Sequence, residues 1–184
     1  ESKRMGEPKL LMPFGRSTVL EQTVDNLLSA KISELIVVVG YRAKEIINLI
    51  ACRPIKIAIN LAYRQGMSTS VVAGLNLIDD KAKTVMLALA DQPLIDSKVI
   101  DKLIEEFLSH DKGIAIPVYQ GRRGHPVIFS SKYKEELLRL EDDVGGRFII
   151  KGHPDDILEV AVDSPSINMD IDDTSDYILG IEKI

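Results

Sequence analysis

The stretch TVMLALADQP, residues 84–93, decides the fold of this chain. Its nearly continuous apolar run is typical of a strand that is covered on both faces of a sheet. In open parallel sheets, ligands bind beyond the carboxyl ends of the strands, so Asp91 is expected at the ligand-binding edge. A carboxylate at that edge suits Mg²⁺, which prefers hard oxygen ligands. The alternative is an ordinary turn, because Asp and Pro are both common turn residues.

Similar short apolar runs and helical patterns lie on both sides of this stretch. The predicted strands cover residues 35–40, 55–60, 84–90, 113–119, 126–129 and 158–162. Helical spacing of apolar residues marks helices around residues 20–28, 46–50, 71–78, 99–107, 137–140 and 177–181, with Ser68 as the N-cap of the third and the fourth following Ser97. Alternating strands and helices predict an α/β fold with a mostly parallel sheet and helices on both faces, in one domain over residues 1–184. The part from about residue 121 to 156 departs from this alternation and is interpreted as a lobe over the sheet.

Composition narrows the functional class. The 184 residues carry a net charge of −5, which argues against nucleic-acid binding because such proteins usually present a basic stripe. The single cysteine, Cys52, allows no intramolecular disulfide and fits a cytoplasmic location. Apolar runs all fall short of the roughly 20 residues that a membrane span needs. We therefore expect a cytoplasmic protein that binds neither nucleic acid nor membrane.

A second candidate motif is LAYRQGMSTSVVAGL, residues 61–75. A glycine, small hydroxyl residues and then a helix place backbone N–H groups at a helix N-terminus, which favours anions. Gly66, Ser68 and Ser70 could contact a ribose, a base or a phosphate. The alternative is a loop with a good helix cap.

Two further motifs carry charged residues. In YQGRRGHPVIF, residues 119–129, Arg122, Arg123 and His125 suit an anionic substrate, or else form a basic hairpin turn. In INMDIDDTSDY, residues 167–177, one of several aspartates could be a second magnesium ligand. Residues 173–175 are more simply explained as the N-cap region of the last helix, where acids offset the helix dipole.

The chain opens with ESKRMGEPKLLMPFG, residues 1–15, which reads as a basic loop. Arg4 and Lys9 supply charge for phosphates, and Gly6 allows close approach of the backbone. The loop matches neither the Walker pattern nor the G-x-G-x-x-G dinucleotide pattern. Together with the acids and the helix cap, it predicts magnesium-dependent nucleotide chemistry. We also expect about 8–12 residues in front of it in the natural protein, forming a buried first strand and a glycine turn.

These motifs together resemble the family of nucleotidyltransferases related to molybdenum cofactor cytidylyltransferase, the MobA-like NTP transferases. The opening loop is similar to the second half of the family signature L-A-A-G-x-S-x-R-M-G-x-P-K-L-L-L-P. Further similar segments follow in family order: GMSTSVVAGL, LALADQP, GRRGHPVIF, DDVGGR and DIDDTSDY. The resemblance covers nearly the whole chain.

The resemblance implies a three-layer, Rossmann-like α/β/α fold and transfer of NMP from an NTP to a phosphorylated acceptor, with Mg²⁺ as cofactor and release of pyrophosphate. Arg4 and Lys9 would hold the triphosphate and neutralise its charge. Asp91 and, as second ligand, Asp170 would bind Mg²⁺. The nucleotide-binding residues implied are Ser2, Gly6, Pro8, Asn60, Gly66, Met67, Ser68 and Ser70.

By the same resemblance, Arg122, His125 and Pro126 would face the acceptor, a pterin phosphate such as molybdopterin. CTP is preferred over GTP, and a molybdoenzyme is an expected partner. Two other classes remain open from the sequence. One is a nucleotidyltransferase for a sugar phosphate or methylerythritol phosphate, and the other is a non-catalytic subunit that binds a nucleotide or cofactor.

Overall fold

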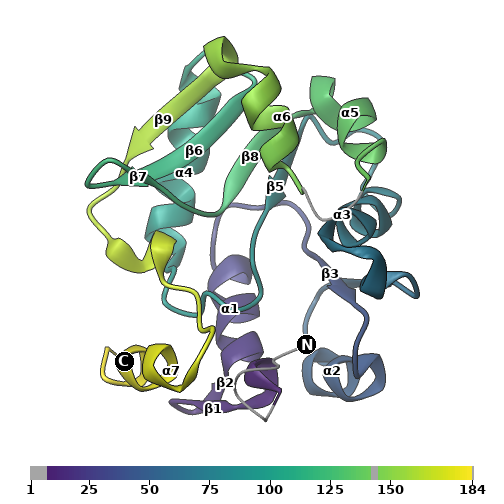
Figure 1. The fold of residues 1–184 in the computed structure, drawn as a ribbon, viewed down its shortest axis with the longest axis vertical. Helices are drawn as coiled ribbons and strands as arrows, with labels where there is room; N and C mark the ends of the chain where they lie inside the picture. Colours follow the sequence, from purple (N-terminus) through teal and green to yellow (C-terminus); the bar gives the residue numbers. More distant parts are fainter. Residues whose placement is uncertain (1–7, 142–144, 184) are drawn as a thin grey trace.

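The computed structural model describes residues 8–141 and 145–183 (Figure 1). Within these ranges it contains nine strands, several of them only two residues long. The strands are β1 (Pro13–Phe14), β2 (Ser17–Thr18), β3 (Ile36–Val39), β4 (Lys56–Ile59), β5 (Thr84–Leu87), β6 (Ile114–Tyr119), β7 (Arg122–Arg123), β8 (Val127–Ser130) and β9 (Ile157–Ala161).

Helices alternate with most of the longer strands. The α-helices are α1 (Val19–Leu28), α2 (Ala43–Ile50), α3 (Met67–Leu75), α4 (Ser97–Ser109), α5 (Lys134–Leu138), α6 (Arg147–Gly152) and α7 (Thr174–Ile181). Short 3-10 turns also occur, at η1 (Lys9–Leu11), η2 (Tyr63–Gln65), η3 (Ser131–Tyr133), η4 (Pro154–Asp156) and η5 (Pro165–Asn168).

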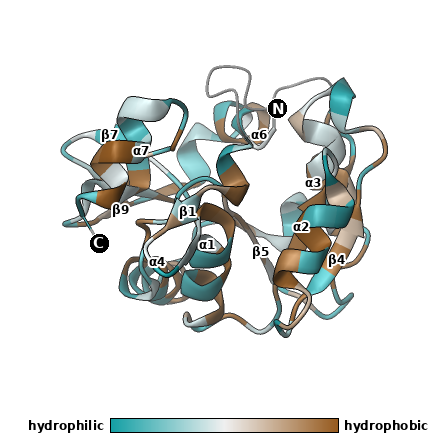
Figure 2. Ribbon diagram, turned by 90° about the horizontal axis from the view of Figure 1, so that it is seen from below, coloured by the Kyte–Doolittle hydropathy of each residue, from teal (hydrophilic) through white to brown (hydrophobic). Residues whose placement is uncertain are grey.

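The main sheet is mixed. Its strands lie in the order β5-β8-β6-β7, and β9 pairs with β6. The β6–β9 pair is parallel, whereas β8 runs antiparallel to both of its neighbours, β5 and β6. A second sheet consists of the parallel pair β3–β4. Figure 2 shows β4, α2 and α3 on one side of the molecule and β7, β9 and α7 on the other, with β5 between them.

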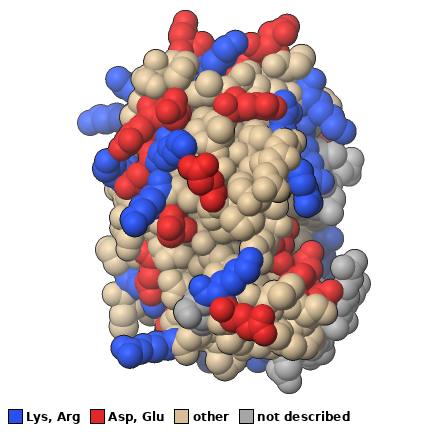
Figure 3. Space-filling model, turned by 90° about the vertical axis from the view of Figure 1, so that its left-hand side faces the viewer, with Lys and Arg blue, Asp and Glu red and all other residues tan. Residues whose placement is uncertain are grey.

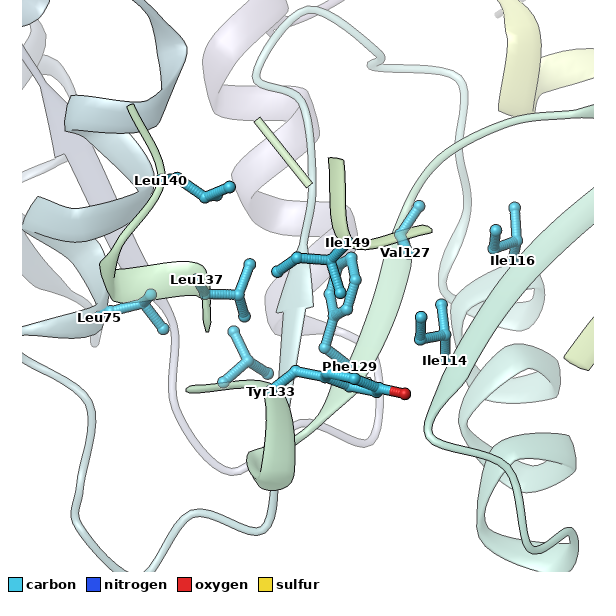
Figure 4. Packing of buried hydrophobic residues seen from close by; sticks show 10 residues of the cluster. Leu75, Ile114, Ile116, Val127, Phe129, Tyr133, Leu137, Leu140 and Ile149 are labelled. Carbon is cyan, nitrogen blue, oxygen red and sulfur yellow. The ribbon is translucent and has the colours of Figure 1, made fainter. Parts of the chain in front are cut away.

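Alternating side chains of the main sheet bury into two separate cores. One core, shown in Figure 4, joins strand residues to α3, α5 and α6. Its strand members include Ile114, Ile116, Val127 and Phe129. The opposite core contains Ala115, which lies between Ile114 and Ile116, and Ile128, which lies between Val127 and Phe129. Both pack against α4. Because neighbouring residues of one strand point to opposite faces, the sheet is covered on both sides and the fold has three layers.

The smaller sheet is covered in the same way. Val39 packs with buried residues of α1 and α2, whereas Val38 lies against α3, where a Cβ atom on Gly74 would be 3.1 Å from it. A cavity of about 190 Å³ runs along β3 and reaches Ala90 after β5. Pro8 and Lys9 line the same cavity, so this part of the opening loop lies between the two sheets.

The α/β fold class predicted from the sequence is confirmed. Each of the six predicted strands and six predicted helices has a counterpart. The strand bounds agree within one residue, except that β5 ends at Leu87, three residues before its predicted end. The segment interpreted as a lobe contributes β8 to the sheet, and α5 and α6 pack over that sheet. The β1–β2 hairpin, β7 and α6 were not predicted, because they are too short to show periodicity.

Two predicted helix starts need correction. Ser68 is not the N-cap of α3: that position is Gly66, and Ser68 lies inside the helix with its side chain fully buried. Helix α4 begins at Ser97 itself, and Asp96 caps it by accepting a hydrogen bond from the Val99 backbone N–H. The last helix was correctly placed, since Asp173 is its N-cap in a capping box with Asp176.

The distribution of surface charge and the lengths of the helices bear on nucleic-acid and membrane binding. On the face drawn in Figure 3, basic and acidic side chains are interspersed and form no basic stripe. The ion pair between Arg123 of β7 and Glu159 of β9 is one example of this pairing. In the described part of the chain, every helix is too short or too polar to cross a membrane.

Candidate active site

Three segments that are distant in sequence meet beyond the end of β5. The first is η1 with β1, the second follows β5 from Ala90, and the third leads into α7. Phe14, Val19 and Ile171 form a small buried core where these segments join. The Ile171 N–H donates to the Asp91 carbonyl at 3.0 Å, and the Tyr177 hydroxyl donates to the Pro13 carbonyl. This packing fixes the charged side chains that surround it.

Lys9 bridges two carboxylates at this junction. Its ammonium group donates to Asp91 Oδ2 at 2.6 Å and to Asp172 Oδ1 at 2.8 Å. The Lys9 and Asp91 side chains are 18% and 21% exposed, and that of Asp172 is 56% exposed. Burial lowers the pKa of Lys9, but the hydrogen bonds to Asp172 and Asp91 outweigh this effect and leave its pKa above the ordinary value. The two carboxylates therefore converge on one fully charged cation.

Asp170 has a different partner. Its Oδ1 accepts a hydrogen bond of 2.5 Å from Gln92 Nε2. Gln92 is only 2% exposed, and the same amide group also donates to the Ile167 carbonyl at 3.4 Å. The buried Gln92, which follows Asp91 directly, thus ties Asp170 to the segment after β5. Asp170 as a magnesium ligand stays a prediction.

Asn60, predicted to hold the nucleotide, organises the turn before α3. Its side-chain amide donates to Thr69 Oγ1 at 2.9 Å and to Ser70 Oγ at 3.0 Å, and its carbonyl oxygen accepts from the Ala62 N–H. The side chain is 5% exposed. Asn60 and Ser70 are therefore brought together by direct contact.

Gly66, Met67 and Ser68 form the start of α3. Gly66 has φ of +114°, a conformation that residues with a side chain rarely adopt. Met67 is about half exposed and lies near Gly145. The Ser68 hydroxyl points inward and donates to the Glu141 carbonyl at 3.1 Å. Met67 is therefore the exposed residue among these three, whereas the buried Ser68 ties the start of the helix to Glu141.

His125 and Pro126 lie between β7 and β8 and are joined by a cis peptide bond. The His125 N–H donates to the Ile167 carbonyl at 3.0 Å. Burial lowers the pKa of the imidazole, and this effect exceeds the opposing ones of Asp170 and of a hydrogen bond to the Leu87 backbone. Within the described residues, His125 Nδ1 is buried without a hydrogen-bond partner. His125 is therefore neutral at pH 7, and Pro126 beside it is buried.

Arg122 lies farther away along the sheet. It is exposed on β7, at the opposite end of the strand order from β5, which leads to Asp91. Its neighbour Arg123 is engaged with Glu159 at 2.7 Å. The contacts of the described residues do not join Arg122 to the Lys9–Asp91–Asp172 junction.

Ser2, Arg4 and Gly6 fall outside the described residues, as do residues 142–144 of the DDVGGR motif. Pro8 is described and precedes η1 directly. Asp172 and Gln92 were not predicted as site residues. Their signals were present but weak: Asp172 belongs to an aspartate-rich stretch, and Gln92 follows the Asp91 that ends an apolar run.

The three-layer α/β fold, with two carboxylates and a lysine meeting beyond the end of β5, places a charged site where open α/β sheets bind their ligands. A family model described as the MobA-like NTP transferase domain matches residues 1–167. The chain belongs to this family and is a nucleotidyltransferase.

Two curated relatives and one solved structure are similar to the chain over most of their length. The chain is 27% identical to molybdenum cofactor cytidylyltransferase of Escherichia coli K12, over 99% of this chain and 91% of the relative. It is also 27% identical to nicotine blue oxidoreductase of Paenarthrobacter nicotinovorans, over 83% and 78% of the two chains. Its structure resembles that of Rv0371c from Mycobacterium tuberculosis H37Rv in complex with manganese. That match has a TM-score of 0.85 and 27% identity, over 97% and 94% of the chains.

Proposed function

We propose that this protein transfers CMP from CTP to the phosphate group of molybdopterin and releases pyrophosphate, with Mg²⁺ as cofactor. The observation that carries the proposal is the convergence of Asp91 and Asp172 on the Lys9 ammonium group, at 2.6 and 2.8 Å. The similarity to the E. coli cytidylyltransferase supports CTP and the pterin acceptor.

The carboxylates of Asp91 and Asp172 fit a magnesium ion. Both supply hard oxygen ligands, and each already lies within hydrogen-bond distance of the Lys9 ammonium group. Among residues 8–141 and 145–183, no group of three or more His, Cys, Asp or Glu side chains could hold a metal. A site with two carboxylates is sufficient for Mg²⁺, which usually completes its shell with waters and substrate phosphates.

Asp91 would hold the ion together with one of two neighbouring acids. Asp172 is favoured because it shares the Lys9 cation with Asp91, whereas Asp170 is engaged by Gln92. When bound, the ion would neutralise phosphate charge and orient the triphosphate. The complex of Rv0371c with manganese supports the use of a divalent metal by this chain.

Lys9 would then contact the triphosphate itself. In the proposed reaction, a phosphate oxygen of the acceptor attacks the α-phosphorus of CTP. The bond from that phosphorus to the oxygen bridging the β-phosphate breaks, and pyrophosphate leaves. An anionic phosphate is already a nucleophile, so the protein mainly positions the two substrates and neutralises their charge. Lys9 and Arg4 carry the neutralising role in this proposal.

The turn from Asn60 to Ser70 would hold the nucleoside. Met67, about half exposed at the start of α3, is the side chain of this turn that a nucleoside could reach. Asn60 would act by shaping this turn, because its amide hydrogen bonds are made to Thr69, Ser70 and Ala62.

The decisive experiment measures pyrophosphate release with CTP and GTP, in the presence and absence of molybdopterin and Mg²⁺. The proposal expects release that requires the acceptor and the metal and is fastest with CTP. Release with a sugar phosphate or methylerythritol phosphate in place of molybdopterin would assign a different acceptor. Nucleotide binding without release for any acceptor would instead indicate a non-catalytic binding subunit.

A further inference from the structure

The acceptor side of the site needs a positive charge that the predicted residues do not provide. His125 is neutral, because burial lowers the pKa of its imidazole. Arg123 is neutralised by Glu159 at 2.7 Å, and Arg122 lies on the far edge strand β7. A phosphorylated acceptor must nevertheless approach three carboxylates, those of Asp91, Asp170 and Asp172.

Helix α6 begins over the face of the sheet, near the end of β5, the strand that leads to Asp91. Gly146, which precedes the helix, packs closely on the sheet: a Cβ atom there would lie 2.9 Å from Phe129 Cζ and 3.4 Å from Leu87 Cδ1. Leu87 is the last residue of β5, and its backbone is hydrogen-bonded by His125. The first residue of the helix, Arg147, is thereby held where β5 ends.

The guanidinium group of Arg147 is available for a ligand. The side chain is exposed, and no ion pair or hydrogen bond engages it in the described parts of the chain. Other arginines contrast with it: Arg42, Arg53 and Arg123 each pair with a carboxylate. The charge of Arg147 acts on His125, as do the charges of Asp170 and Asp91.

We propose that Arg147 binds the phosphate group of the acceptor and holds its attacking oxygen near Asp91. This inference rests on the proposed function, because it assigns one substrate of that reaction to a side chain. Arginine suits the task, since its planar group of donors matches a phosphate in a bidentate arrangement.

The acceptor phosphate is favoured over the triphosphate for a geometric reason. Attacking and leaving oxygens lie roughly in line on opposite sides of the reacting phosphorus. Lys9 lies on the side formed by the opening loop and α7, where it contacts Asp91 and Asp172. Arg147 begins α6, directly after Gly146, which packs against Leu87 at the end of β5. Two cations on different elements can therefore hold the leaving and the attacking phosphate separately.

Steady-state kinetics test the assignment. Replacing Arg147 by Ala should raise the KM for molybdopterin about tenfold or more, as expected for losing a hydrogen bond to a charged group, while the KM for CTP changes less than twofold. Arg147→Lys should recover part of the loss. Arg139→Ala is the matched control, since Arg139 is an exposed arginine whose described ion pair is with Glu135 of its own helical segment. An unchanged acceptor KM in Arg147→Ala would overturn the proposal.

A binding experiment separates this inference from the proposed function. Titration of the full chain with inorganic phosphate, followed by phosphorus NMR, should show saturable binding that is retained in Arg139→Ala and lost in Arg147→Ala. Equal binding by both variants, or no saturable binding by the unmodified chain, would overturn the role of Arg147. Absence of turnover with any nucleotide and molybdopterin would overturn the proposed function, while the phosphate titration would still decide the role of Arg147.

Discussion

The Lys9 ammonium group lies 2.6 Å from Asp91 Oδ2, although the two residues are 82 positions apart in the chain. Lys9 belongs to the loop before α1, and Asp91 follows β5. A third segment completes the arrangement through Asp172, 163 positions from Lys9. The candidate active site is thus assembled by the fold from both ends and the middle of the sequence.

Replacing Lys9 by Ala should lower turnover roughly 100- to 1,000-fold, the range found when one preorganised charge-stabilising group is removed from an active site. The variant leaves Asp91 and Asp172 without their shared cation, so the triphosphate would meet uncompensated negative charge. Pyrophosphate release is the measurement. Lys9→Arg should retain more activity than Lys9→Ala because it keeps the positive charge. It should remain below the unmodified chain because a guanidinium group lacks the compact shape of an ammonium group.

Lys31→Ala provides the control for the Lys9 experiment. Lys31 forms an ion pair of similar length, 2.7 Å to Glu105, on an exposed surface away from the three segments of the site. Its removal should leave turnover unchanged. Normal turnover in Lys9→Ala, measured beside this control, would show that Lys9 has no part in the reaction.

Gly66→Ala should weaken nucleotide binding and lower the free energy of unfolding by about 1–3 kcal/mol. The reason is the φ angle of +114°, which an alanine can adopt only with strain. Urea unfolding and the KM for CTP are the two measurements. Gly152→Ala is the matched control, because a Cβ atom on Gly152 would meet no atom within 4 Å. If Gly66→Ala and Gly152→Ala have the same free energy of unfolding, the positive φ angle at residue 66 does not require glycine.

The main strands and helices could be predicted from the sequence because each carries its own periodic pattern. Val38 and Val39 point to opposite sides of the sheet, and a continuous apolar run records this burial on both faces. The direction of β8 could not be predicted in this way. An apolar run such as Val127–Ser130 has the same pattern whether the strand runs parallel or antiparallel, since both directions bury the same side chains.

The candidate site shows the same division. Asp91 could be singled out because it ends an apolar strand, and position at a strand end is a local property of the sequence. The sequence does not show which of four neighbouring aspartates pairs with Lys9. That choice depends on how α7 packs on the β1–β2 hairpin through Tyr177 and Pro13. The Ser68 N-cap was wrong for a related reason: the hydroxyl bonds to the Glu141 carbonyl, 73 positions away, instead of capping its own helix.

Acid should destabilise the fold through Asp156. Burial raises the pKa of this carboxyl, but the hydrogen bonds from Lys132 and Tyr133 outweigh it and bring its pKa from 3.8 down to about 2. A folded-state pKa below the unfolded value means that the stabilisation is fully present above about pH 4. It is lost as the pH falls towards about 2.

Urea unfolding between pH 7 and pH 2.5 measures this effect. Asp156→Asn should be less stable than the unmodified chain at pH 7, and the difference should shrink as the pH falls. Asp155→Asn, in the same 3-10 turn, should keep the full pH dependence because its side chain forms none of these hydrogen bonds. A difference for Asp156→Asn that is constant with pH would refute the assignment.

Titration with Mn²⁺ should identify the second carboxylate of the metal site. Asp91→Asn and Asp172→Asn are each expected to lower the affinity for Mn²⁺ at least tenfold, because each removes one of two charged oxygen ligands. Asp170→Asn should have a smaller effect, since the Asp170 carboxylate is engaged by Gln92. Asp163→Asn, an exposed acid outside the three segments, is the control. A larger loss in Asp170→Asn than in Asp172→Asn would mean that Asp91 and Asp170 hold the ion. In that case Asp172 would serve only to position Lys9.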